Sequence, residues 1–193
     1  MHVMEVGVGY ALTTIADELA DTLDRVVHDD PLPLARVAEA IATSPRVFVL
    51  GAGRSGLALR MTAMRLMHLG LEVHVVGDVT TPAIRGGDLL LAASGSGTTP
   101  GIVRAAQTAA DAGARVAAIT TVATSPLAAL AADTTVTVPA AAKLDRSGAA
   151  SAQYAGSLFE QAVVIIGDAL FHALWRRSGQ AADDLWPRHA NLE

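Results

Sequence analysis

The ten residues from Val47 to Gly56, VFVLGAGRSG, decide the fold of this chain. The first four are apolar, which is typical of a strand buried on both faces of a sheet. A glycine-rich turn follows directly, and residues 55–69 then have the pattern of a helix. A buried strand, a tight turn and a helix together predict one βα unit of a parallel sheet.

The same alternation continues along the chain. Further strands are predicted at 73–76, 88–93, 115–119 and 134–138, and helices between them at 99–112 and 125–132. Gly70 and Gly113 stand where glycines commonly end helices. Thr99 before Pro100 predicts a helix start with a capping hydroxyl. We therefore predict an α/β fold, with a doubly wound five-stranded parallel sheet flanked by helices.

Helices are also predicted before and after the sheet. Apolar residues recur at helical spacing over Tyr10–Val27, and a short helix fits Leu34–Ala42. One long helix, apolar over most of its circumference, is predicted from Ser157 to Trp175. The predicted organisation is a single domain over residues 1–193, with N-terminal helices within 8–43 and a C-terminal helix plus tail over 157–193.

The composition restricts the class of protein. Of 193 residues, 51% are hydrophobic and 17% are charged, and the formal net charge is -5. Such a low charge content predicts that some apolar surface is buried between subunits, in a homo-oligomer. The negative net charge and the lack of a basic run argue against nucleic-acid binding. Because the chain has no cysteine, disulfides, thiolate chemistry and cysteine-ligated zinc are excluded.

The sequence indicates a cytoplasmic protein. Its start, Met1–Glu5, lacks the basic and apolar regions of a signal peptide. Apolar stretches such as Ala162–Gly167 are too short to cross a bilayer, so we expect no membrane partner.

The first glycine loop, Gly51–Gly56, matches the dinucleotide fingerprint G-x-G-x-x-G. Asp78, at the end of the next predicted strand, is a candidate for the acid that binds a ribose. An NAD(P)-dependent oxidoreductase is therefore one hypothesis. It leaves little chain for a substrate domain, and it gives the second loop no role.

The second loop, Ser94–Thr99, follows another buried strand and leads into a helix. Small residues allow close approach of an anion, the helix N-terminus adds partial positive charge, and the hydroxyls complete the shell. There is neither a P-loop lysine nor a G-x-S-x-G nucleophile elbow. The two loops together predict a phosphorylated ligand.

Candidate acid–base groups are few. Glu160 interrupts an apolar run and is a candidate base, but Ser157 and Glu160 also form an S-x-x-E capping box, which the spacing alone favours. His68 and His74 have the placement of ordinary surface or packing residues. His189 lies in a polar tail that either frays or docks on a neighbouring subunit. No set of residues has metal-ligand spacing.

Five segments of the chain resemble the 6-phospho-3-hexuloisomerase family, whose members are sugar isomerase (SIS) domain enzymes of the ribulose monophosphate pathway of formaldehyde fixation. The two loops are typical of SIS domains in general, whereas 64–70 and the terminal RHANLE are typical of this enzyme family. Many relatives carry Glu at position 98, where this chain has Thr98. The segments are 51–56, 64–70, 94–99, 153–161 and 188–193.

This resemblance implies a single SIS domain of flavodoxin-like topology that interconverts D-arabino-hex-3-ulose 6-phosphate and D-fructose 6-phosphate through an enediol. It assigns the base to Glu160 and a supporting role to His189, across a subunit boundary. It implies neither cofactor nor metal, and it names 3-hexulose-6-phosphate synthase as pathway neighbour. A non-catalytic sugar-phosphate-binding module is a further hypothesis. The expected substrate-binding residues are Gly53, Arg54, Ser55, Ser94, Gly95, Ser96, Gly97, Thr98 and Thr99.

Overall fold

The structure, a computed structural model, contains one five-stranded sheet in which every strand pair is parallel. It describes residues 7–141, 145 and 151–192. The strand order is β2-β1-β3-β4-β5, the order of flavodoxin-like doubly wound folds. The predicted fold class is therefore confirmed. The strands are β1 (Val47–Gly51), β2 (Val73–Val75), β3 (Leu89–Ala93), β4 (Arg115–Thr120) and β5 (Thr135–Thr137).

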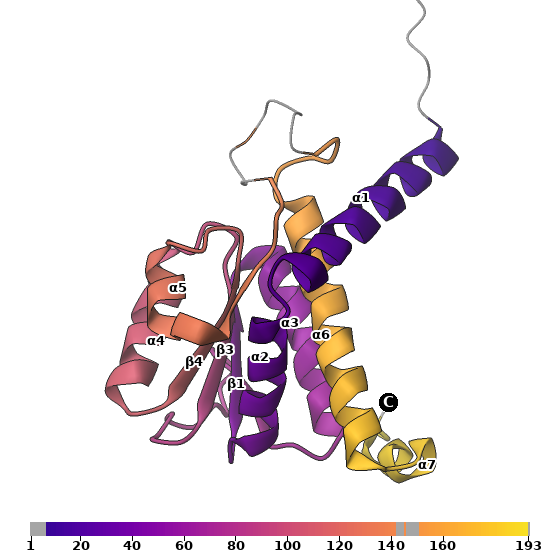
Figure 1. Cartoon of the computed structure of the whole chain (residues 1–193). Coiled ribbons are helices and arrows are strands. Elements are labelled where there is room, and N and C mark those ends of the chain that lie inside the picture. The colour runs from indigo at the N-terminus through magenta and orange to yellow at the C-terminus, as the bar shows by residue number, and fades with distance from the viewer. Residues whose placement is uncertain (1–6, 142–144, 146–150, 193) are drawn as a thin grey trace, which may run out of the picture.

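Helices cover both faces of this sheet (Figure 1). Helices α2 (Leu32–Thr43), α3 (Gly53–His68) and α6 (Ser157–Ser178) pack on one face, and α4 (Pro100–Asp111) and α5 (Pro126–Ala131) on the other. The remaining elements are α1 (Val8–Asp29), α7 (Ala182–Leu185) and the short 3-10 helices Ala132–Thr134 and Trp186–Arg188.

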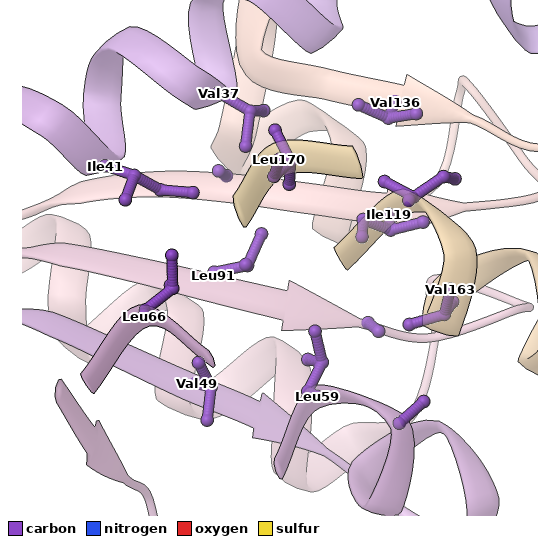
Figure 2. Close-up of a cluster of buried hydrophobic side chains, with 14 of the residues drawn as sticks. Val37, Ile41, Val49, Leu59, Leu66, Leu91, Ile119, Val136, Val163 and Leu170 are labelled. Carbon is purple, nitrogen blue, oxygen red and sulfur yellow. The ribbon is translucent and has the colours of Figure 1, made fainter. Parts of the chain in front are cut away.

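Alternate residues of the strands point to the two helical layers, so there are two hydrophobic clusters. Phe48 and Leu90 face α4 and α5, whereas Val49 and Leu91 face α3 and α6. Figure 2 shows the larger cluster, in which strand side chains meet Leu59 of α3 and other helical residues. Its labelled members are Val37, Ile41, Val49, Leu59, Leu66, Leu91, Ile119, Val136, Val163 and Leu170.

Helices α3 and α6 pack more closely than ordinary side chains allow. A Cβ atom added at Gly167 of α6 would overlap Oγ1 of Thr62 on α3, so glycine is required at this contact. The first turns of the same two helices carry Arg54 and Glu160. Close packing of α3 on α6 therefore places these two residues near each other at the starts of the two helices.

The predicted capping hydroxyl of Thr99 is wrong, although Thr99 is the N-cap of α4 and Pro100 is its first residue. The Thr99 side chain makes no hydrogen bond to the helix. Its Oγ1 lies 2.9 Å from Ser94 Oγ instead, because the loop folds back so that the two hydroxyls meet.

Helix α6 is long and apolar enough, by length and composition, to cross a membrane. The expectation from the sequence concerned uninterrupted apolar runs such as 162–167, whereas this helix qualifies only by its mean hydropathy, as core helices of globular proteins also do. Eight residues of α6 are buried in the fold, including Phe159 and Val163. Its apolar face is that of a core helix packed against α3.

Candidate active site

The two glycine loops lie side by side because β1 and β3 are neighbours in the sheet, with Gly51 paired to Ala93. The loops follow the carboxyl ends of these strands, where doubly wound folds bind their ligands. Together with the start of α6 they line a cavity of about 510 Å³. All nine expected substrate-binding residues except Gly97 line it, and so does Glu160.

The first loop is a tight strand-to-helix turn. A Cβ atom at Gly51 would lie 2.8 Å from Gly56 N, and one at Gly56 would lie 2.5 Å from Gly51 O. Backbone packing therefore explains Gly51 and Gly56, and a φ of +57° explains Gly53. Asp78, the candidate ribose acid, forms an ion pair with Arg60 at 2.8 Å and does not line the cavity.

The second loop presents a cluster of hydroxyls at the start of α4. Ser94 Oγ and Thr99 Oγ1 share a hydrogen bond of 2.9 Å, and Thr98 Oγ1 donates to Ser96 Oγ at 2.9 Å. Gly97 has a φ of +62°, and a Cβ atom there would overlap Ser125 Oγ. The loop is thus held in one conformation beside α5.

Sequence reasoning missed the residues that support this loop from behind. Thr120 Oγ1 and Thr121 Oγ1 both donate to the carbonyl oxygen of Gly95, at 3.1 and 2.9 Å. Phe159 of α6 also lines the cavity. The sequence did contain a signal for this support, the pair of threonines at the end of β4. Because β4 is parallel to β3 and next to it, both strands end at the same edge of the sheet.

Glu160 lies on the first turn of α6 and points to the first loop. Its Oε2 is 2.7 Å from Arg54 Nε, and its side chain is only 19% exposed. The capping box that the spacing favoured is wrong, because the N-cap is Gly156 and no side chain caps the helix. The chain enters α6 one residue earlier than a Ser157 cap requires, so Glu160 is left to face the cavity.

His189 is not in this cavity of its own chain. Its ring stacks on the ring of His68 at the far end of α3, with centroids 3.9 Å apart. Helix α3 has 16 residues, so its two ends are about 24 Å apart at 1.5 Å per residue. The structure therefore brings Glu160, Arg54 and both loops together but separates His189 from them.

The C-terminal segment is docked rather than frayed. Arg188 Nη1 donates to the carbonyl oxygen of His68 at 3.0 Å and to Gln180 Oε1 at 3.2 Å. His68 is buried, as a packing residue, and burial, together with the nearby His189 and Arg65, lowers the pKa of its imidazole. The expectation of a frayed end is thus wrong for Arg188 and His189, which contact His68 at the end of their own α3.

Within the described part of the chain, no group of three or more His, Asp or Glu side chains has the arrangement of a metal site. The cavity combines a hydroxyl-rich loop at the start of a helix with the carboxylate of Glu160 and the guanidinium of Arg54. Such a set can hold a phosphate ester and transfer a proton on the part of the ligand that extends beyond it.

Comparison with known proteins agrees with this arrangement. The SIS domain family matches residues 40–165, and the chain belongs to this family. Within it, the chain is 58% identical to the 3-hexulose-6-phosphate isomerase of Mycobacterium gastri, over 94% of this chain and 89% of that protein. It is 37% identical to the Bacillus subtilis protein of the same name, over 82% of this chain and 85% of that one.

A solved structure supports the same relationship. The chain superposes on the crystal structure of a Methanococcus jannaschii protein with a TM-score of 0.79. The function inferred for that protein from its structure is that of a 3-hexulose-6-phosphate isomerase. The two chains are 28% identical, and the match covers 95% of this chain and 99% of that one. The similarity therefore extends over the whole domain, with the helices that flank the SIS core.

Proposed function

We propose that this protein is a 3-hexulose-6-phosphate isomerase, which interconverts D-arabino-hex-3-ulose 6-phosphate and D-fructose 6-phosphate. The observation that carries the proposal is the shared cavity in which the hydroxyl-rich loop 94–99 and the Glu160 carboxylate lie together. The similarity to named isomerases over nearly the whole chain supports the same activity. The reaction moves one proton between two carbons, so a phosphate anchor and a base are its main requirements.

The phosphate group binds in the second loop. Ser94, Ser96, Thr98 and Thr99 offer hydroxyls, and the N-terminal end of the α4 helix dipole adds partial positive charge. Ser55 extends this binding surface from the first loop. Binding energy from the phosphate, which does not react, then orients the reacting carbons at the base.

Glu160 is the proposed base. Its carboxylate removes the proton from C3 of fructose 6-phosphate, which gives an enediol across C2 and C3. Return of this proton to C2, with the hydroxyl proton of C3 transferred to the oxygen at C2 so that the C3 oxygen becomes the carbonyl, completes the isomerisation. No electrons leave the sugar, so the chemistry requires no redox cofactor. Arg54 places a positive charge beside Glu160, where negative charge develops on the enediolate oxygens.

His189 is proposed to assist proton transfer at the sugar oxygens from a neighbouring copy of the chain. The Glu160 cavity of the same chain lies at the opposite end of α3 from His189. Only a homo-oligomer would therefore bring the His189 ring to a substrate. Exposed apolar residues support such an assembly. Leu57, Met61 and Met64 form a stripe on α3, and the half of α1 that projects from the domain exposes Val8 and Leu12 (Figure 1).

We propose that the enzyme is cytoplasmic and that it acts in the ribulose monophosphate pathway. There it converts the product of 3-hexulose-6-phosphate synthase into fructose 6-phosphate. The synthase is a neighbour in this sequence of reactions.

Thermal unfolding with ligands tests the proposal against the two other hypotheses. We expect fructose 6-phosphate to raise the melting temperature of the wild type and NAD(P) to leave it unchanged. Glu160→Gln should be stabilised by fructose 6-phosphate as well, because Glu160 acts on carbon and not on phosphate. Stabilisation by NAD(P) alone would support an oxidoreductase. Stabilisation by the sugar phosphate without any turnover of it by the wild type would support a binding module.

A further inference from the structure

A second cavity, of about 500 Å³, lies next to the one that holds Glu160. Arg54 lines both cavities, so its side chain forms part of the wall between them. Helix α1, residues 152–154 and the start of α6 form the rest of the second cavity. Glu160 and Gln161 are consecutive on α6, about 100° apart around the helix, and Gln161 lines the second cavity as Glu160 lines the first.

Three hydrogen bonds tie this region to Glu18 on α1. Its carboxylate accepts from Ala152 N at 2.6 Å, from Ser151 Oγ at 3.0 Å and from Gln153 Nε2 at 3.1 Å. Burial by itself would raise the pKa of the Glu18 carboxyl, but these hydrogen bonds lower it below its ordinary value. Glu18 is therefore ionised at neutral pH and can only accept hydrogen bonds.

This fixed acceptor sets the direction of the next two hydrogen bonds. Because Gln153 must turn its NH₂ group to Glu18, its Oε1 faces Gln161 and must accept. Gln161 Nε2 donates to that oxygen at 2.8 Å. The orientation of both amides thus follows from the carboxylate at the end of the chain of bonds.

Within the described part of the chain, these hydrogen bonds leave Gln161 Oε1 without a donor. It is buried, and among the described residues it has no hydrogen-bond partner. An acceptor buried without a partner is costly, and the cost is removed when a ligand supplies a donor. A sugar hydroxyl is such a donor.

We propose that the second cavity is a subsite for the unphosphorylated end of the substrate, where Gln161 Oε1 accepts a hydrogen bond from the hydroxyl on C1. The inference rests on the proposed function. With the phosphate in loop 94–99 and C2 and C3 at Glu160, C1 is the end of the substrate left for the neighbouring cavity, which shares Arg54 with the first. Both proposed ketoses carry a hydroxyl on C1, so the same contact serves the substrate and the product.

The test compares two ligands on two proteins by calorimetry: fructose 6-phosphate and 1-deoxyfructose 6-phosphate, on the wild type and on Gln161→Met. Met keeps the length of the side chain and removes its acceptor. We expect the wild type to bind the deoxy ligand about tenfold more weakly than fructose 6-phosphate. In Gln161→Met, both ligands should bind with the weaker affinity, because the partner of the hydroxyl has gone.

Two controls separate a binding role from a structural one. The affinity for inorganic phosphate should be unchanged in Gln161→Met, and Gln107→Met, on the exposed face of α4, should retain the tenfold preference. If Gln161→Met keeps the preference of the wild type, or loses phosphate affinity as well, the proposal is wrong.

A second variant keeps the proposal testable if Gln161→Met folds poorly. Glu18→Gln supplies a donor where the wild type has only an acceptor, so the amides of Gln153 and Gln161 can reverse. We expect the preference for the C1 hydroxyl to fall at least threefold, and an unchanged preference would contradict the network. Failure of the proposed function is a different result, in which the wild type does not interconvert the two ketoses.

Discussion

Gly97 constrains the shape of the second loop, residues 94–99, in two ways. Its φ of +62° is one that residues with a Cβ atom rarely adopt, and the space where that atom would lie is filled by Ser125. A side chain at this position would meet both the unfavourable φ and the Ser125 side chain. Neither a change of the backbone nor a shift of Ser125 alone would therefore accommodate a substitution.

We predict that Gly97→Ala lowers the free energy of unfolding by roughly 1–3 kcal/mol and weakens the binding of phosphate esters, because the loop must move away from Ser125. Chemical denaturation and calorimetry with fructose 6-phosphate measure the two effects. Gly101→Ala is the matched control, since nothing lies within 4 Å of its added Cβ atom and alanine favours a helix. Equal stability of the two variants would contradict this account of the loop.

At the scale of residues, the sequence predicted which side chains gather at the cavity better than it predicted what they contact. The glycine and hydroxyl positions of both loops could be found because they follow buried strands. The contacts of Thr99 and Glu160 could not, because a capping motif depends on the residue at which the chain enters the helix. Gly156 and not Ser157 is that residue for α6, and no local pattern distinguishes the two.

At the scale of elements, the close contact of α3 with α6 holds the site together. We predict that Gly167→Ala lowers the free energy of unfolding by about 1–3 kcal/mol, because the added methyl group overlaps Thr62. Urea denaturation measures the change. In a Thr62→Ala background the same substitution should cost little or stabilise the helix, since the obstructing side chain has gone. Additive effects of the two substitutions would show that the helices do not meet at this pair.

The starts of β1 and β3 are joined by a buried ion pair. Arg46 donates to Asp88 from Nε at 3.1 Å and from Nη2 at 2.6 Å, and Arg85 N donates to the same carboxylate. Burial opposes ionisation of Asp88, but the hydrogen bonds from Arg46 and from Arg85 N, together with the charges of both arginines, outweigh it and lower the pKa of its carboxyl. The folded state therefore favours the ionised form more than the unfolded state does.

We predict that stability is lost when the pH falls below about 4, the ordinary pKa of an aspartate, and that the loss continues through the lower folded pKa. The contribution of Asp88 is fully present above that range. Urea denaturation from pH 3 to 7 should show a smaller acid loss for Asp88→Asn than for the wild type. The remaining loss comes partly from Glu18, whose pKa is also lowered. Asp111→Asn, on the exposed end of α4, should keep the full acid dependence, and the same dependence in Asp88→Asn would contradict the assignment.

Most elements could be predicted from the sequence because their signals are local. The strands β1, β3 and β4 are short runs of buried residues bounded by turns, and the prediction places them to within a residue. Helix α3 begins two residues earlier than predicted, because its first turn includes Gly53, which reads as part of the loop. Helix α7 was missed, since a helix of a single turn has no periodic pattern.

At the scale of the whole molecule, the position of His189 could not be predicted, because stacking on His68 depends on contacts between residues 121 positions apart in sequence. The same contact holds His189 away from the Glu160 cavity of its own chain. The Glu160 cavity and the His189 segment lie at opposite ends of α3, so the role proposed for His189 requires a second chain.

We predict that Glu160→Gln and His189→Ala are each strongly impaired alone and regain part of the activity when mixed and refolded together. In a hybrid with a two-chain site, one cavity receives an intact Glu160 from one chain and an intact His189 from the other. A coupled assay for fructose 6-phosphate measures the recovery, and two preparations of one variant, mixed with each other, are the control. Absence of recovery in a hybrid that assembles would mean that His189 does not act in a neighbouring subunit.

The central claim is that Glu160 moves a proton between C2 and C3 of a phosphorylated ketose. The most direct measurement is NMR of fructose 6-phosphate in D₂O with the wild type and with Glu160→Gln. We predict that the wild type forms the 3-ketose and introduces deuterium at C3 of the remaining fructose 6-phosphate. Glu160→Gln should still bind the ligand but exchange at least a hundredfold more slowly, the usual contribution of a general base. Equal exchange rates for the two proteins, or an inactive wild type, would contradict the account.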